Sequence, residues 1–221
     1  MPTDASASLM QSHARVTVVG HPLIQQHLTT LRNEETSPAD FRLSVRRLAT
    51  LLAYEATKDL RCEETPVETP LTTATGHRLC ERITLTPILR AGLGMVDPVL
   101  DLIPTAEVWH LGLYRDEATA RPVSYYNKLP EGGATDVALV VDPMLATGGS
   151  AVAALKTLAE WGVPRLKLLS IIASSEGVAT VESEFPEAQI YVCAVDAELN
   201  NQKFIVPGLG DAGDRTFNTP R

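Results

Sequence analysis

One stretch of the chain decides its fold: Asp142-Pro143-Met144-Leu145-Ala146-Thr147-Gly148-Gly149-Ser150. The apolar residues 137–141 precede it, and an alanine- and leucine-rich segment with helical spacing, residues 151–159, follows it. This order predicts a strand, a tight loop and a helix. Gly148 and Gly149 carry no Cβ, so backbone N–H groups at the junction can approach a ligand closely.

The same loop predicts a phosphate site. Thr147 and Ser150 add hydroxyl donors, and the helix that begins near Gly149 presents unpaired N–H groups and the positive end of its dipole. Together these groups favour a phosphate monoester. Asp142, at the carboxyl end of the strand, can accept hydrogen bonds from sugar hydroxyls beside that phosphate. The stretch therefore indicates a sugar phosphate, and an ordinary strand-to-helix turn without a ligand is the alternative.

Two better-known phosphate loops do not fit this stretch. No Gly-Lys-Ser/Thr follows it, and no lysine occurs between Lys128 and Lys156, which excludes a Walker loop. The pattern Gly-x-Gly-x-x-Gly is missing here, so the loop is not a dinucleotide fingerprint.

Composition narrows the class of protein. The 221 residues, 44% of them hydrophobic, suit one large globular domain. We expect residues 1–14, which are polar and rich in serine and alanine, to form a disordered tail, and residues 15–221 to form a single domain. The net charge of -8, with no long basic run, argues against a nucleic-acid partner.

The cysteines and the apolar segments indicate the cellular compartment of the protein. Cys62, Cys80 and Cys193 are odd in number and show no metal-binding spacing, which points to a reducing cytosol. No apolar segment approaches the length of a membrane span, and the first residues lack a signal-peptide core. We therefore expect a cytoplasmic protein without a membrane partner.

Strand-like and helix-like segments alternate along most of the chain. This alternation predicts an α/β fold, a mostly parallel sheet flanked by helices. The strands are expected at residues 16–19, 83–89, 107–113, 137–141, 166–173 and 189–195, with an edge strand at 67–71; the helices are expected at residues 23–33, from Ser37-Pro38 onward, after the loop 90–94 up to 102, at 149–161 and at 176–184. Residues 200–221 show no strong periodicity.

Three loops are expected at the edge of the sheet where ligands bind, the carboxyl ends of its strands. They are residues 90–94, 114–115 and 142–150. The long polar stretch 114–135, which contains Tyr125, Tyr126 and Lys128, can be a flexible lid that excludes water or an arm used in subunit contacts. Both interpretations stay open at this point.

Five separated motifs support a family assignment. In chain order they are Thr86-Pro87-Ile88-Leu89-Arg90-Ala91-Gly92, Gly112-Leu113-Tyr114-Arg115, Tyr125-Tyr126-Asn127-Lys128-Leu129-Pro130, the stretch 142–150, and Ile205-Val206-Pro207-Gly208-Leu209-Gly210-Asp211-Ala212-Gly213-Asp214-Arg215. With these motifs the chain, from about 16 to 219, resembles the uracil phosphoribosyltransferases of the type I phosphoribosyltransferase family. Purine and orotate relatives usually carry two adjacent acids where this chain has Asp142-Pro143. The chain departs from the family at Asn218, commonly glycine, and in ending Pro220-Arg221, where a lysine is usual.

The resemblance implies a glycosyltransferase of pyrimidine salvage. Uracil and 5-phosphoribosyl 1-diphosphate (PRPP) would give UMP and diphosphate, with Mg²⁺ as cofactor. Some members of the family are activated by GTP and form dimers or tetramers. The resemblance therefore also implies an allosteric GTP effector and a homodimer or homotetramer.

The resemblance also implies a role for each motif. Residues 142–150 would bind PRPP, with Thr147 to Ser150 on the 5′-phosphate and Asp142 on the ribose hydroxyls. Arg90 and Arg115 would approach the diphosphate. A C-terminal hood would hold uracil through Ile205, Gly210, Asp211 and Ala212, largely by backbone groups. Asp211 would also contact PRPP and the metal, and Asp142, Arg90 and Asp211 would be catalytic.

The chemistry agrees with these residue types. A guanidinium stays charged and offers fixed, forked donors to a leaving diphosphate, although a surface ion pair is the simpler role for Arg90 or Arg115. Mg²⁺ would bridge substrate oxygens and keep waters, so a dense carboxylate cluster is not required. Uracil presents acceptor, donor and acceptor along one edge, which backbone amides and a carbonyl can match. The five histidines lie outside every motif, and we assign none of them a catalytic role: His13, His21, His27, His77 and His110.

Three other functions compete with this one. A regulatory protein that senses UMP or PRPP and binds RNA would need a basic surface, which the net charge of -8 disfavours. A transferase for another base is disfavoured by residues 205–215. A non-catalytic interaction domain would not need the complete set of phosphate, arginine and base-loop residues.

Overall fold

The structure, a computed structural model, describes residues 15–115, 122–126 and 129–220. Its centre is a parallel sheet, and the predicted α/β fold is confirmed. Across the sheet the strands run β1 (Val16–Val18), β11 (Gln189–Asp196), β10 (Arg165–Ser174), β8 (Val137–Val141), β4 (Ile83–Pro87) and β5 (Glu107–Val108). The short β9 (Met144–Leu145) pairs with β10 just beyond the end of β8. Every pairing within this sheet is parallel.

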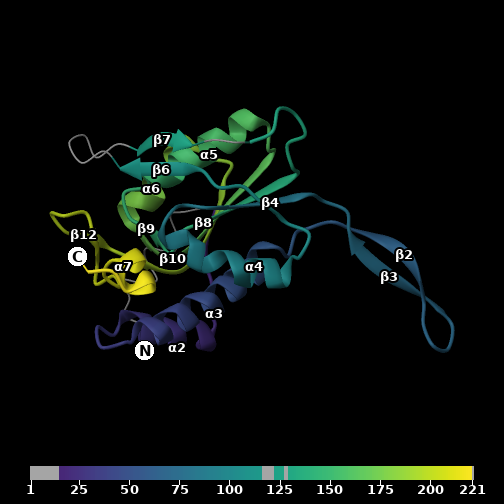
Figure 1. Cartoon of the computed structure of the whole chain (residues 1–221), viewed down its shortest axis with the longest axis horizontal. Coiled ribbons are helices and arrows are strands. Elements are labelled where there is room, and N and C mark those ends of the chain that lie inside the picture. The colour runs from purple at the N-terminus through teal and green to yellow at the C-terminus, as the bar shows by residue number, and fades with distance from the viewer. Residues whose placement is uncertain (1–14, 116–121, 127–128, 221) are drawn as a thin grey trace.

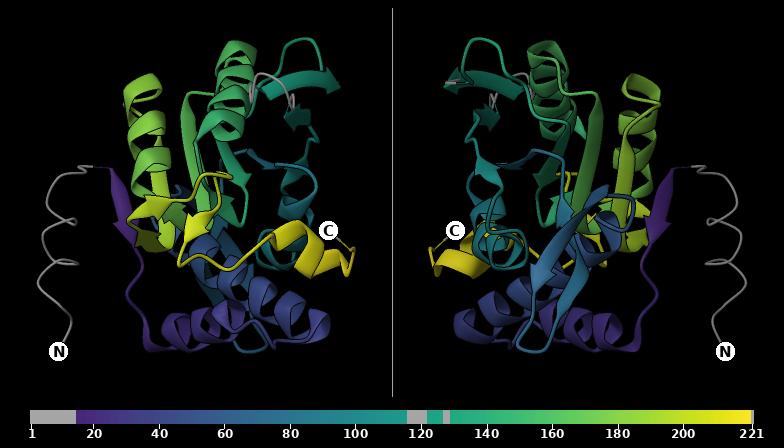
Figure 2. Two further views of the ribbon diagram at one scale, coloured as in Figure 1. Left: turned by 90° about the vertical axis from the view of Figure 1, so that its left-hand side faces the viewer. Right: turned by 90° about the vertical axis from the view of Figure 1, so that its right-hand side faces the viewer.

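Helices cover both faces of the sheet (Figures 1 and 2). On one face lie α2 (Pro22–Arg32), α3 (Pro38–Ala56), the 3-10 turn η1 (Ala91–Met95) and α4 (Val96–Leu102), and on the other lie α5 (Gly149–Trp161) and α6 (Ser175–Glu184). Ser37 caps α3 as predicted, since its Oγ accepts the Asp40 N–H at 3.2 Å. All five residues of β8 are buried and contribute alternately to the two cores, which explains its uninterrupted apolar sequence.

A hairpin of β2 (Cys62–Glu68) and β3 (Thr73–Leu79) projects from the body of the molecule (Figure 1). The edge strand predicted at 67–71 is therefore wrong. Residues 67–68 end β2, residues 69–72 form the turn, and neither strand joins the main sheet. Both faces of the hairpin are largely exposed, so its sequence lacks the alternation of apolar and polar residues that marks a half-buried strand.

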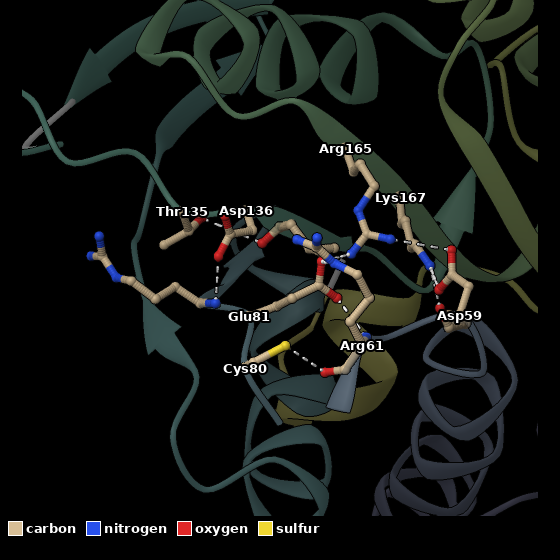
Figure 3. Close-up of polar contacts among 11 residues, drawn as sticks. Asp59, Arg61, Cys80, Glu81, Thr135, Asp136, Arg165 and Lys167 are labelled. Atoms are coloured by element: carbon tan, nitrogen blue, oxygen red, sulfur yellow. Dashed lines mark hydrogen bonds and ion pairs between the residues drawn. The ribbon is translucent and has the colours of Figure 1, made fainter. Parts of the chain in front are cut away.

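An ionic network centred on buried Glu81 holds the base of this hairpin against the amino end of the sheet (Figure 3). The Glu81 side chain is 1% exposed and accepts hydrogen bonds from Arg61 Nε and from the Arg61 backbone N–H, each at 2.8 Å. Arg165 Nη2 forms a second ion pair with it at 2.6 Å. Burial raises the Glu81 pKa, but the hydrogen bonds from the two arginines outweigh it and leave the pKa below its usual value. Beside the two ion pairs of Glu81, buried Lys167 donates hydrogen bonds to the Ala56 carbonyl and the Asp59 carboxylate.

Two further segments differ from their predictions. The strand expected at 107–113 is divided: β5 pairs with β4, Leu111 forms one further bridge with Ile88, and the chain then pairs as β6 (Gly112–Arg115) with β7 (Pro122–Tyr126). Part of the polar stretch 114–135 is therefore a hairpin strand. Residues 200–221 contain β13 (Ile205–Val206), paired with β12 (Glu198–Leu199), and the helix α7 (Ala212–Phe217), which is too short to show periodicity.

None of the helices in the described part of the chain is long and apolar enough to cross a membrane. The predicted tail, residues 1–14, lies outside the described residues.

Candidate active site

The loops that follow β4 and β8 meet because these two strands are neighbours in the sheet. The Ile88 N–H donates to the Val141 carbonyl at 3.0 Å, directly before Asp142. A Cβ on Gly92 would lie 2.5 Å from the same carbonyl, so the turn that carries Arg90 packs closely against the end of β8. The structure thus brings two of the three predicted loops together at the carboxyl edge.

The loop 142–150 has the shape that its sequence predicts. Gly148 lies at φ +82°, the left-handed region that favours glycine, and α5 begins at the next residue. No side chain caps the amino end of α5, so its first N–H groups face the loop without a side-chain acceptor. Neither the Thr147 nor the Ser150 hydroxyl bonds another described residue. The phosphate site predicted here keeps its donors available.

Helix α6 supports this loop from behind, a role that the sequence interpretation missed. The Ser174 Oγ donates to the Ala146 carbonyl at 2.5 Å and accepts the Gly177 N–H at 2.9 Å, which caps α6. A Cβ on Gly177 would lie 2.4 Å from the Ala146 oxygen and 2.7 Å from the Leu145 oxygen. The first turn of α6 therefore fixes the backbone of the loop. The sequence Ser174-Ser175-Glu176-Gly177 predicts the start of a helix, but it does not predict the contact of that helix with the loop 142–150.

Asp142 lies where β8 ends. Its backbone N–H donates to the Leu169 carbonyl at 3.2 Å, and its Oδ1 accepts the Met144 N–H at 3.3 Å. Burial raises the pKa of its carboxyl to about 7, and the single hydrogen bond from Met144 only partly opposes this effect. No cation pairs with Asp142 among the described residues, so a ligand hydroxyl or a proton has to satisfy it.

Arg90 follows a cis peptide bond, Leu89–Arg90, and its side chain is 60% exposed. Its Nη2 pairs with Asp214 of α7 at 3.1 Å. A Cβ on Gly213 would lie 3.2 Å from Asp211 Oδ1 and 3.8 Å from Arg90 Nη2, so Arg90 and Asp211 flank the same glycine. The C-terminal motif is thereby joined to the arginine loop although 124 residues separate Arg90 from Asp214. Asp214 is a site residue to which the sequence interpretation gave no role.

The C-terminal segment 205–212 closes this edge of the sheet. Gly208 and Gly210 have positive φ values of 61° and 74°. Ile205 and Ala212 are buried in the core, whereas Gly210 and Asp211 between them are partly exposed. Asp211 caps α7 by accepting the Asp214 N–H on Oδ1 at 2.9 Å. Asp211 with Asp214 three residues on is a helix-start pattern that could have revealed α7.

Arg115 ends β6, opposite Pro122 of β7. Its side chain lies outside what the structure describes, as does Lys128. The β6–β7 hairpin packs beside α5, the helix that begins at the phosphate loop. The two roles given to residues 114–135, a lid and a subunit arm, stay predictions.

The donor set bears on the magnesium prediction. Within the described residues, no group of three or more His, Cys, Asp or Glu side chains could hold a metal ion by itself. Asp211 uses one carboxylate oxygen as a cap, and the other bonds none of the described residues. One available carboxylate oxygen near Arg90 fits Mg²⁺ held mainly by substrate oxygens and water.

The parallel sheet, the glycine-containing loop 142–150 at its carboxyl edge and the C-terminal segment beside the Arg90 turn are the architecture of a type I phosphoribosyltransferase. Residues 18–219 match the model of the family described as "Uracil phosphoribosyltransferase". The chain belongs to the uracil phosphoribosyltransferase family.

Individual relatives agree with this assignment. The uracil phosphoribosyltransferase of Roseiflexus sp. (strain RS-1) is 59% identical over 93% of this chain and 99% of its own length. That of Symbiobacterium thermophilum is 52% identical with the same coverage. Among solved structures, the AQ2163 protein from Aquifex aeolicus superposes with a TM-score of 0.86 and 38% identity, covering 91% of this chain and 97% of the other.

Proposed function

We propose that this chain transfers the phosphoribosyl group of PRPP to N1 of uracil. The bond from ribose C1 to diphosphate breaks, the bond from C1 to N1 forms, and the N1 proton leaves the base. The products are UMP and diphosphate. The observation that carries the proposal is the joining of three elements at one edge: the phosphate loop, the Arg90 turn and the segment 205–212.

Each element has one task in this reaction. The open amino end of α5, with Thr147 and Ser150, would bind the 5′-phosphate. Asp142 would accept hydrogen bonds from the ribose hydroxyls, which would replace the proton that burial favours. Arg90 and Arg115 would stabilise the diphosphate as its negative charge grows.

The base would be selected by the backbone of the Gly210 to Ala212 segment, in which Gly210 and Asp211 are partly exposed. Asp211 would contribute a carboxylate oxygen to Mg²⁺. When bound, that ion would neutralise charge on the leaving diphosphate.

An assay of diphosphate release with PRPP, Mg²⁺ and a panel of bases tests the proposal. We expect turnover with uracil and none above background with hypoxanthine or orotate. Faster turnover with a purine or with orotate would contradict the proposal and indicate a phosphoribosyltransferase for that other base. Binding of RNA that weakens steeply with salt, without turnover, would favour the regulatory alternative.

A homodimer or homotetramer, a GTP effector and a cytoplasmic location stay predictions from the family resemblance. Sedimentation with and without GTP tests the first two.

A further inference from the structure

One ion pair holds both backbone groups of Gly208. Arg32 of α2 forms two hydrogen bonds with Asp196, at 2.7 and 2.8 Å, and its Nη1 also donates to the Gly208 carbonyl at 2.8 Å. Asp196 Oδ2 accepts the Gly208 N–H at 3.1 Å. The side chains of Arg32 and Asp196 are only 25% and 8% exposed. The ion pair thus bonds both the N–H and the carbonyl of Gly208, in the segment 205–212.

The next residue is held by a second guanidinium. Arg215 Nη1 donates to the Leu209 carbonyl at 2.8 Å and to the Leu31 carbonyl at 2.5 Å. Its Nη2 donates to the Asn33 carbonyl at 2.6 Å. Arg32 and Arg215 therefore connect consecutive residues of the segment to the same carboxyl end of α2.

Gly208 suits this arrangement because of its backbone. Its φ is +61°, and a Cβ there would lie 2.0 Å from the Ile205 oxygen. Only glycine fits this position, and because glycine is itself flexible, the hydrogen bonds from Arg32 and to Asp196 are what fix the direction of its peptide groups. Gly210, whose backbone is assigned to uracil above, follows two residues later.

The chemistry of the pair favours arginine. A guanidinium presents parallel N–H donors to both oxygens of a carboxylate and retains another donor for a carbonyl. A lysine ammonium is a point charge and cannot reproduce this fork.

We propose that Arg32 and Asp196 are positioning residues that set the specificity of this site for the uracil base. They hold Gly208 so that the N–H groups of residues 210–212 meet the base at hydrogen-bond distance. Asp196 is paired in the sheet with Ser174, which bonds the loop 142–150, but that pairing runs through the backbone. Among the described residues, neither the Arg32 nor the Asp196 side chain bonds the loop, so we expect phosphate binding to be retained when the pair is changed. This inference rests on the proposed function.

The test compares two ligands that share the ribose and its 5′-phosphate and differ at C1, where one carries uracil and the other a hydroxyl. UMP carries uracil and the 5′-phosphate, whereas ribose 5-phosphate carries the phosphate and sugar alone. Titration calorimetry of wild type, Arg32→Lys and Asp196→Asn gives both affinities. We expect both variants to bind UMP roughly tenfold more weakly, as supporting residues of a site typically do, while ribose 5-phosphate affinity stays within about twofold of wild type. Arg15→Lys is the matched control, since Arg15 also pairs with a carboxylate and a carbonyl, both of Glu187, at the opposite edge of the sheet.

The outcomes separate the two levels of the argument. UMP affinity equal to wild type in the variants would overturn the proposal, and so would equal weakening of both ligands, which would indicate general loosening. A wild-type protein that binds UMP no better than ribose 5-phosphate would contradict the proposed function itself. Melting curves establish that each variant is folded. If Arg32→Lys does not fold, Asp196→Asn decides, because asparagine keeps an acceptor for the Gly208 N–H.

Discussion

At the scale of single residues, two charged side chains of the site differ in their partners. Asp142 has no cationic partner among the described residues, whereas the exposed Arg90 pairs with Asp214. An exposed ion pair contributes little to stability. Their placement at the carboxyl edge of neighbouring strands therefore indicates a role toward a ligand, and each role has its own test.

Replacing Arg90 with alanine should lower kcat/KM for PRPP by roughly 10²-fold, because the arginine would contact charge that grows in the transition state. Arg46→Ala is the control, since Arg46 makes a similar exposed pair with Asp97 and touches none of the site loops. Steady-state kinetics of both variants decide. A loss of kcat/KM below about threefold in Arg90→Ala would show that this arginine only forms a surface ion pair.

Asp142 should make the stability of the free protein fall as pH rises. The folded carboxyl holds its proton up to about pH 7, whereas the ordinary pKa is 3.8, so between these values the folded state binds more protons. The free energy of unfolding then decreases through this interval. Asp142→Asn should remove a decrease on the order of 3 kcal/mol. Urea unfolding at pH 5 and pH 8 measures it, and parallel behaviour of wild type and variant would refute the burial of this carboxyl.

At the scale of elements, the sequence predicted what local pattern determines. The helix at 149–161 and the strand at 137–141 have the predicted bounds, because Gly148 and Gly162 flank the helix and Asp136 and Asp142 flank the apolar run of the strand. The hairpin β2–β3 was missed since its exposed strands carry no such pattern. The contact of α6 with the phosphate loop could not be predicted, because it joins residues that the sequence separates by about 30 positions.

That contact makes Gly177 a sensitive position. In Gly177→Ala the added Cβ would clash with the carbonyls of Leu145 and Ala146, and the loop would have to move. The KM for PRPP should rise by roughly 10²-fold, since displacements near 1 Å can have effects of this size. Gly20→Ala is the control, because a Cβ there meets nothing within 4 Å. An unchanged KM in a folded Gly177→Ala protein would show that α6 does not fix the loop.

At the scale of the whole molecule, the candidate site and the network that holds the β2–β3 hairpin lie at opposite ends of the strands. The phosphate loop, the Arg90 turn and the C-terminal segment lie at the carboxyl ends of the strands, and the Glu81 network holds the hairpin at the amino ends (Figure 3). The motifs of the site could be recognised in the sequence. Their supports, Arg32 with Asp196 and Ser174 with Gly177, could not, because each is an ordinary residue until the fold pairs it.

This separation predicts a variant that loses stability and keeps activity. Glu81→Gln should lower the free energy of unfolding by about 2 kcal/mol, since it weakens the hydrogen bonds of a buried carboxylate. Arg165 keeps its ion pair with Asp59 at 3.7 Å, so no buried charge is left without a partner. Per folded molecule, kcat should stay within about twofold of wild type, because no site loop touches Glu81. Glu63→Gln, in the exposed Arg78 pair, should change stability little. Denaturation and kinetics on the same samples give both readings, and a Glu81→Gln protein as stable as wild type would contradict the role of the network.

The most direct test of the account is base selection by the wild-type protein. If backbone N–H groups of the Gly210 to Ala212 segment meet the 4-oxo group of uracil, cytosine places an amine donor against a donor and loses its own N3 proton. We predict kcat/KM for uracil about 10⁴-fold above that for cytosine, as for sites built on such hydrogen bonds. 5-Fluorouracil, which keeps the same hydrogen-bonding edge, should be a substrate. Cytosine within tenfold of uracil would contradict selection of the base by this backbone segment.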